Sequence, residues 1–390
     1  MISKCVGIRR KGAFSAEEVA AAAVELRQAT GGSALFALAF VTPGYLPHVE
    51  EFSEIVRVDG HVIDLVGSTG QGLTSGGIET EEEEGFSLLS FTSAKAAFHV
   101  ATFSQRTVEE SRSTAAWRKD GGEDPNAWII LANPFVFDTE TWLAEWNAAY
   151  PGIPAVGGLA SGANEGENVG VFYNGRVVDG LAVAVRGMKL MPVVSQGCRP
   201  IGEPLTVTKA ESNVVYSLGA HPAYEALESA FEGLSDSEKA TAKGNLFAGL
   251  AGTEYVEDFK PGDFLIRDIL GADPNSGAVQ IGGIPRIGQT LQYQLRNKTS
   301  ADAEWRAVLR AAAAEIKQPP LASLLFSCSG RGSSLFGSEN HDAGLLEEII
   351  GEHPSAGFFC NGEIAPLGGR SYIHSYTASC ALFFDDEPLP

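Results

Sequence analysis

A short glycine motif occurs three times in this 390-residue chain and constrains the fold more than any other feature. It reads G-x-x-x-polar-G at 67–72, 157–162 and 357–362. An apolar strand candidate lies upstream of each copy, at 34–41, 128–132 and 322–326. Glycine permits turns and close backbone approaches that a Cβ atom would oppose. The repeated context therefore predicts three related strand and Gly-loop units.

The third copy shows the expected plan most fully. An apolar run at 323–327 ends at Ser329-Gly330-Arg331-Gly332, and apolar residues then recur at helical spacing over 342–350. Pro354 stops that helix, and a second strand over 356–360 leads into the Gly loop. Two strands joined by a crossover helix lie parallel, so their loops emerge at one edge of the sheet, where open α/β sheets place ligands. We expect the three Gly loops to line one shared cleft or two related clefts.

Other segments extend this plan with helices and antiparallel hairpins. Ser15 is placed to cap a helix over 15–29, and residues 139–149 form an amphipathic helix with two tryptophans on its apolar face. Asn174-Gly175 joins two apolar runs, which is a strong hairpin signal. The acidic run 79–84 is expected to be a solvated loop. The sequence thus predicts a mixed α/β fold in which mixed parallel and antiparallel sheets are flanked by helices.

The length of the chain exceeds one comfortable hydrophobic core, so two domains are expected. Prolines at 192, 200 and 204 interrupt regular structure between the two halves. We place the boundary there, which gives domains at 1–197 and 198–390.

Composition excludes several functions. The net charge of −21 argues against a nucleic-acid partner or an anionic membrane surface. No apolar run approaches the roughly 20 residues of a membrane helix, and the N-terminus does not resemble a secretory signal. The five cysteines are scattered and odd in number, which does not describe a disulfide framework. We expect a cytoplasmic protein without membrane insertion.

Catalytic signatures are mostly missing. The chain carries no phosphate loop, nucleophile elbow or zinc-binding H-E-x-x-H helix, so no cofactor and no metal site are expected. One enzymatic alternative uses Cys328 or Cys360 as nucleophile with His374 as base, in a cysteine-dependent hydrolase or transferase. Against this, cysteines within apolar strands usually behave as small buried hydrophobes.

The favoured ligand-binding residues follow the strands of the third repeat. Arg331 can hold a carboxylate through two parallel hydrogen bonds, and Glu363 can hold an ammonium, so the two complement an amino acid. The predicted ligand-binding set is Arg331, Asn361, Gly362, Glu363, Ser161, Gly162 and Ser68. Two structural alternatives are that Arg331 and Glu363 pair with each other, or that Glu363 bonds backbone amides in its own turn.

Several of these segments carry a family resemblance. The segments are PAVGGLASG and NVGVFYNGRVVDGLAVAVRG in the first half, and GDFLIRDILGADPNSGAVQIGGIPRIGQTLQYQLRN, FSCSGRGSSLFG and AGFFCNGEIAPLGG in the second. They resemble the FIST family, whose N- and C-terminal domains occur as bacterial sensory input modules and in an F-box ubiquitin-ligase subunit. The resemblance implies signalling through a bound small-molecule ligand, such as an amino acid or a related metabolite, toward a downstream signalling protein. It supplies no catalytic residues.

Overall fold

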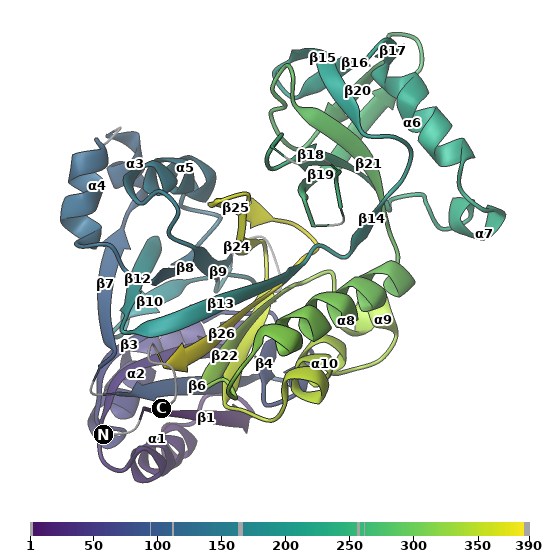
Figure 1. Cartoon of the computed structure of the whole chain (residues 1–390). Helices are drawn as coiled ribbons and strands as arrows, with labels where there is room; N and C mark the ends of the chain where they lie inside the picture. The colour runs from purple at the N-terminus through teal and green to yellow at the C-terminus, as the bar shows by residue number, and fades with distance from the viewer. Residues whose placement is uncertain are drawn as a thin grey trace. The chain divides into compact units, whose positions relative to one another are not determined.

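A computed structural model of the chain describes residues 3–93, 95–110, 113–162, 167–255, 258–260 and 262–385. The chain forms two compact units (Figure 1). Unit 1 comprises residues 1–194, 308–373 and 377–390, and unit 2 comprises residues 195–307 and 374–376. The chain passes from unit 1 into unit 2 three residues before the boundary predicted after 197, and it returns to unit 1 at Val308. Unit 2 is therefore inserted into the sequence of unit 1, whereas the sequence analysis expected two consecutive domains.

Unit 1 contains three six-stranded sheets. The first has the order β1 (Lys4–Lys11), β6 (Gly85–Thr92), β2 (Ala34–Val41), β3 (Val62–Thr69), β10 (Val171–Tyr173) and β11 (Arg176–Val178). The second has the order β25 (Arg370–His374), β24 (Glu363–Leu367), β9 (Ala155–Leu159), β8 (Ala127–Ala132), β12 (Gly180–Arg186) and β7 (Ala97–Phe103). The third has the order β13 (Met188–Ser195), β26 (Ala378–Asp385), β22 (Ala322–Cys328), β23 (Ser355–Cys360), β4 (Leu73–Ser75) and β5 (Ile78–Thr80).

The three sheets share one plan. Each is centred on a parallel pair, which is β2–β3, β8–β9 or β22–β23, and each pair has an antiparallel neighbour on both sides. The crossovers include α2 (Val49–Asp59), α5 (Thr139–Ala149) and α10 (His341–Ile350). The hairpin that follows each second parallel strand leaves its own sheet and joins another: β4–β5 pairs with β23, β10–β11 with β3, and β24–β25 with β9. The predicted mixed α/β fold is confirmed, and the three repeats are interlocked by exchanged hairpins.

Further helices accompany the repeats of unit 1. They are α1 (Ala16–Thr30), η1 (Pro43–His48), α3 (Gln105–Glu109), α4 (Thr114–Gly121), α9 (Ser333–Phe336) and the second part of α8 (Lys298–Glu315), whose residues up to Ala307 belong to unit 2. The Ser15 hydroxyl accepts the Glu18 amide at the start of α1, as the sequence predicts. The tryptophans of α5, Trp142 and Trp146, are buried in an aromatic cluster with Trp117 and Trp128. A second core draws side chains from all three sheets, with Phe40, Phe326 and Phe358 in mutual ring contact.

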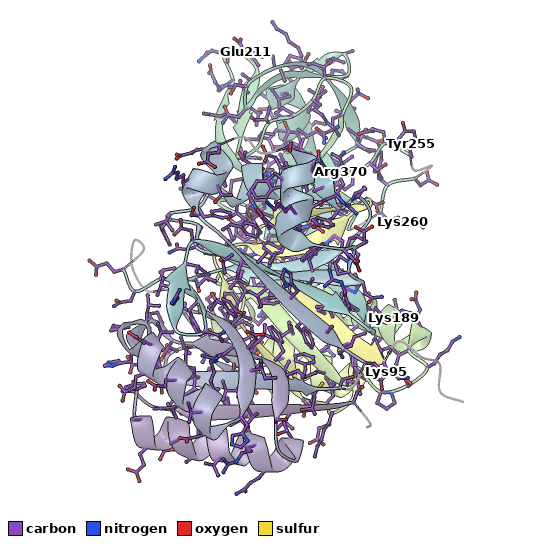
Figure 2. The ribbon with its side chains drawn as sticks, turned by 90° about the vertical axis from the view of Figure 1, so that its left-hand side faces the viewer. Lys95, Lys189, Glu211, Tyr255, Lys260 and Arg370 are labelled. Atoms are coloured by element: carbon purple, nitrogen blue, oxygen red, sulfur yellow. The ribbon has the colours of Figure 1, made fainter. Side chains whose placement is uncertain are left out.

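Unit 2 is a small antiparallel barrel with two helices. Its elements are β14 (Cys198–Pro200), β15 (Leu205–Glu211), β16 (Val214–Leu218), β17 (His221–Pro222), α6 (Ala223–Glu232), α7 (Asp236–Lys239), β18 (Leu246–Ala251), β19 (Phe264–Asp273), β20 (Ala278–Ile281) and β21 (Thr290–Arg296). Strands β21, β15, β16, β20, β19 and β18 form a closed ring because β18 also pairs with β21. Leu227 and Ala230 of α6 pack onto the barrel core. Tyr255, which is 98% exposed, projects into solvent from a loop (Figure 2).

Candidate functional site

The three Gly loops meet one another in unit 1. Each second parallel strand donates a backbone amide to the glycine that precedes an exchanged hairpin: Thr69 to Gly170 at 2.9 Å, Leu159 to Gly362 at 2.8 Å and Phe359 to Gly72 at 2.9 Å. The loops therefore gather at one place, although their parallel pairs belong to three sheets, and the cleft expected there stays a prediction. The glycine equivalent to Gly72 and Gly362 is Gly170, because the second copy carries a longer loop before its hairpin.

The first glycine of each motif is required by a close backbone approach. A Cβ atom at Gly67, Gly157 or Gly357 would lie 2.2, 1.8 or 1.8 Å from a carbonyl oxygen of the preceding parallel strand. The contacted residues, Ala39, Ile130 and Leu325, are the register partners of those glycines. The motif therefore has a packing role in all three repeats.

The serines of the first two loops are used within the loops. Ser161 is buried, and its hydroxyl accepts the Gln71 amide at 2.8 Å and donates to the Phe359 carbonyl. Ser68 is also buried, and its hydroxyl donates to the Thr69 carbonyl at 3.1 Å. The Ser161 hydroxyl thus ties the second loop to the first and the third, whereas the Ser68 hydroxyl bonds to the next residue of its own strand.

The third loop leaves one predicted side chain facing solvent. Asn361 is exposed, whereas Gly362 and Glu363 are buried. The Glu363 carboxylate accepts the Thr377 amide at 3.1 Å, and its backbone pairs with Gly158. Among the predicted ligand contacts in this loop, Asn361 is thus the accessible one.

Arg331 lies in a buried ion pair with Asp342. Its Nε and Nη2 atoms donate to Asp342 Oδ2 and Oδ1 at 2.6 and 2.9 Å, and both side chains have no solvent exposure. The guanidinium also lies 5.3 Å from the ring centre of Phe336. Burial alone would raise the pKa of Asp342, but the charge of Arg331 and hydrogen bonds from Arg331, His341 and Ser327 hold that pKa well below its usual range. The Arg331 guanidinium was predicted to hold a ligand carboxylate, and in the structure it holds the carboxylate of Asp342 instead.

Glu79 supports the same region by capping α10. Its carboxylate accepts the backbone amides of His341, Asp342 and Ala343 at 3.1, 2.9 and 2.9 Å. Burial, followed by the negative charge of Asp342, raises the pKa of Glu79 to about 7. The expectation of a solvated acidic loop is therefore wrong for Glu79, which is 7% exposed. The α10 amides lack intrahelical partners, and a carboxylate from a distant hairpin satisfies them.

The cysteine alternative has little geometric support at Cys360. Cys328 and Cys360 are register partners at the ends of β22 and β23. Burial raises the pKa of Cys360 well above its ordinary value, which disfavours the reactive thiolate. Cys328 is half-buried and its sulfur accepts the Gly330 amide at 3.4 Å, while His374 is a buried residue of unit 2. Across the described ranges, no group of three or more His, Cys, Asp or Glu side chains is placed to hold a metal ion.

A cavity of about 640 Å³ lies in unit 2 beside the start of α8, and sequence reasoning missed it. We call it the α8 cavity. It is lined by Cys198, Arg199, Glu238, Asn297, Thr299, Ser300, Ala303, Glu304 and Ala307. Arg199 pairs with Glu238, and their side chains are 37% and 28% exposed. No local motif marks the cavity, because its residues come from a strand end and two helices far apart in the chain.

Hydrogen bonds fix the walls of the α8 cavity. The Asn297 side chain accepts the Ser300 amide at 2.8 Å and so caps the first turn of α8. Glu304, one turn further on, accepts the Ser195 hydroxyl at 3.0 Å and the Gly197 amide at 2.6 Å. The cavity thus combines one cation, two carboxylates and a helix N-terminus.

Comparisons with known proteins identify a family. The model of the FIST N domain matches residues 35–221, and the model of the FIST C domain matches residues 223–366. The uncharacterized protein Rv0628c of Mycobacterium tuberculosis is 34% identical over 387 residues, covering 98% of both chains. The uncharacterized protein Mb0898c of Mycobacterium bovis is 40% identical over 260 residues, covering 66% of this chain and 67% of its own.

A crystal structure of cyanuric acid hydrolase from A. caulinodans covers 99% of this chain and 100% of its own, with 10% identity and a TM-score of 0.36. A likeness of that size carries no argument about fold or function. In the part of the chain that the structure describes, no helix has the length and apolarity needed to cross a membrane.

Proposed function

The chain belongs to the FIST family, whose domains are sensory and signal-transduction domains, and on that premise we propose that it senses a small zwitterionic metabolite of the amino-acid class, bound in the α8 cavity. The observation that carries the proposal is the set of opposite charges around one cavity. At about 640 Å³, the cavity falls within the range of roughly 300–1,000 Å³ typical of small-molecule sites.

The cavity offers a partner to each end of an amino acid. The Arg199 guanidinium and the first backbone amides of α8 favour a carboxylate, because both present N–H donors and positive charge. Glu304 and Glu238, which also line the cavity, favour an ammonium. Binding would exchange the half-exposed ion pair of Arg199 and Glu238 for bonds to the ligand. Ion pairs at the surface contribute little to stability, so this exchange costs little.

In this proposal the residues of the Gly loops mainly support the fold of unit 1. Ser68, Ser161, Gly362 and Glu363 hold the loops together, and Arg331 anchors α10, so we assign them positioning roles. Asn361 is the alternative ligand contact, proposed together with Gly162, where a Cβ atom would lie 2.8 Å from Val169 and 3.3 Å from Pro43. The ligand state would be passed to a downstream signalling protein, as a sensory domain requires.

A thermal-shift screen against the free amino acids, with their decarboxylated amines and deaminated acids as controls, tests the proposal. A ligand present at about 100 times its Kd should add about 2.7 kcal/mol to the free energy of unfolding. We expect a zwitterion to stabilise the protein more than either single-charge control. We also expect Arg199→Lys to weaken binding, because lysine lacks the planar fork.

Asn361→Ala serves as the matched control, since it changes an exposed side chain in unit 1. Affinity that survives Arg199→Lys and Arg199→Ala but falls in Asn361→Ala would move the site to the Gly loops. A screen in which no amino acid stabilises the protein at millimolar concentration would reject the ligand class.

A further inference from the structure

A second cavity of unit 2, about 400 Å³ in volume, lies between α6 and the barrel. We call it the α6 cleft. Its lining includes Leu205, Leu218, Ala226, Ala230, Leu291 and Tyr293 as an apolar floor, and Glu203, His221, Glu225 and Ser229 as a polar rim. None of these residues lines the α8 cavity, so the two cavities have separate walls.

The frame of the α6 cleft is fixed by hydrogen bonds and close packing. The Gln292 side-chain amide donates to the Gly202 carbonyl at 2.8 Å, and the Tyr293 hydroxyl donates to the Ala223 carbonyl at 2.8 Å. Gly202 has φ +64°, and a Cβ atom there would lie 2.9 Å from Ala230 Cβ. The loop that carries Glu203 is therefore held against α6, and the cleft is built into the fold of unit 2.

The charge on the rim of the α6 cleft has one sign. Glu203 lies on the loop before β15, and Glu225 lies on α6, one helical turn from Ser229. No lysine or arginine belongs to the lining, and within the described ranges neither carboxylate takes part in an ion pair. His221 is the remaining titratable group on the rim. A ligand that reaches the apolar floor thus passes carboxylates and meets no permanent cation.

This chemistry separates the α6 cleft from the α8 cavity. A zwitterion would find no partner for its carboxylate and would place that charge near Glu203 and Glu225. An organic cation with an apolar body would bury the body on Leu218 and Leu291 and keep its ammonium at the rim, where charge-assisted hydrogen bonds to carboxylates are strong. A neutral apolar molecule would gain only the burial of its surface against the apolar floor and no hydrogen bond between charged groups at the rim.

We propose that the α6 cleft is a second ligand site, which binds a primary amine carrying an apolar group. This inference goes beyond the zwitterion sensing proposed for the α8 cavity and does not depend on it. The amine and the zwitterion would be two inputs to one sensory protein.

Isothermal titration with phenethylamine, phenylacetate and 2-phenylethanol tests the proposal, because the three probes share a ring and differ in charge. We expect phenethylamine to bind and phenylacetate not to bind. We expect 2-phenylethanol to bind about tenfold or more weakly than the amine, since a hydrogen bond to a charged group is worth roughly 1.5–3 kcal/mol.

Variants locate the amine on the full-length protein. The double variant Glu203→Gln, Glu225→Gln should lose about tenfold or more in affinity for phenethylamine, and Ala226→Trp should block the cleft. Arg199→Ala should leave amine binding unchanged, so failure of the α8 proposal would not affect this test. Equal affinities for the amine and the alcohol, full affinity in the double variant, or no binding of the amine at 10 millimolar (roughly 2.7 kcal/mol of affinity) would each overturn the inference.

Discussion

Replacing Arg331 by methionine should destabilise the protein by about 3–5 kcal/mol, because the change leaves a buried carboxylate without its cation. The Asp342 side chain has no solvent exposure, and it receives two bonds from Arg331 at 2.6 and 2.9 Å. Methionine has a similar length and is apolar, so the main loss is electrostatic and the cavity left behind is small.

The double variant Arg331→Met, Asp342→Leu should recover part of that loss, since it removes the orphaned charge. Recovery will be incomplete because Ser327 and His341 also bond to Asp342, at 2.7 and 2.9 Å, and would lose their acceptor. Each buried donor left unbonded costs about 1–3 kcal/mol. The His341 side chain is 11% exposed and can bond water, so only the Ser327 hydroxyl is left buried and unbonded, and we expect the double variant to lie about 1–3 kcal/mol below the wild type.

Urea unfolding followed by tryptophan fluorescence measures these changes, because Trp117, Trp142 and Trp146 are buried in unit 1. Arg331→Lys, which keeps the charge and loses the fork, should cost about 1.5–3 kcal/mol. A double-mutant cycle of Arg331 with Glu363 is the control and should show much weaker coupling than the cycle with Asp342. An Arg331→Met variant within about 0.5 kcal/mol of the wild type would refute this reasoning.

Three further predictions concern pH, packing and thiol reactivity. Burial raises the pKa of Glu79 to about 7 from an ordinary 4.5, so its contribution to stability is complete below pH 4.5 and is lost as pH rises through 7. Unfolding free energies across this window should fall by up to about 3 kcal/mol, and Glu79→Gln should remove that part of the slope. Gly157→Ala should cost more than about 3 kcal/mol, because its Cβ would lie 1.8 Å from the Ile130 carbonyl oxygen. Gly344→Ala in α10, where the nearest atom would be 3.7 Å away, should stabilise by about 0.5–1 kcal/mol in the same denaturation assay. Cys360 should resist thiol reagents at pH 8 in the native protein, because burial raises its pKa. Rapid labelling of Cys360, measured by peptide mass analysis, would instead support the cysteine-dependent hydrolase or transferase.

Elements specified by nearby residues could be predicted from the sequence. The helix over 139–149 has the predicted bounds, and the helix predicted over 15–29 forms at Ala16–Thr30 behind its predicted Ser15 cap. The Asn174-Gly175 hairpin forms because both turn residues take positive φ, +48° and +85°. In each case the signal lies within one or two turns of chain.

Long-range pairings could not be predicted. Nothing near residue 73 shows that β4 leaves its own repeat to pair with β23, nearly three hundred residues later. The partner of Arg331 is Asp342, which comes from the start of α10, while the sequence suggested Glu363 because both follow parallel strands. The positions of charged residues in the sequence identify candidates for ion pairs, but which of them form a pair depends on the fold. The α8 cavity was missed for the same reason.

Backbone amide hydrogen exchange with and without the stabilising amino acid tests the central claim most directly, because it places the ligand on the chain. Ligand at about 100 times its Kd should slow exchange about 100-fold in segments that open only when the ligand leaves. The proposed sensor predicts this protection at residues 197–200 and in the first turn of α8, with exchange in the loops at 161–162 and 361–363 unchanged. Protection confined to those Gly loops, with the start of α8 unaffected, would contradict it.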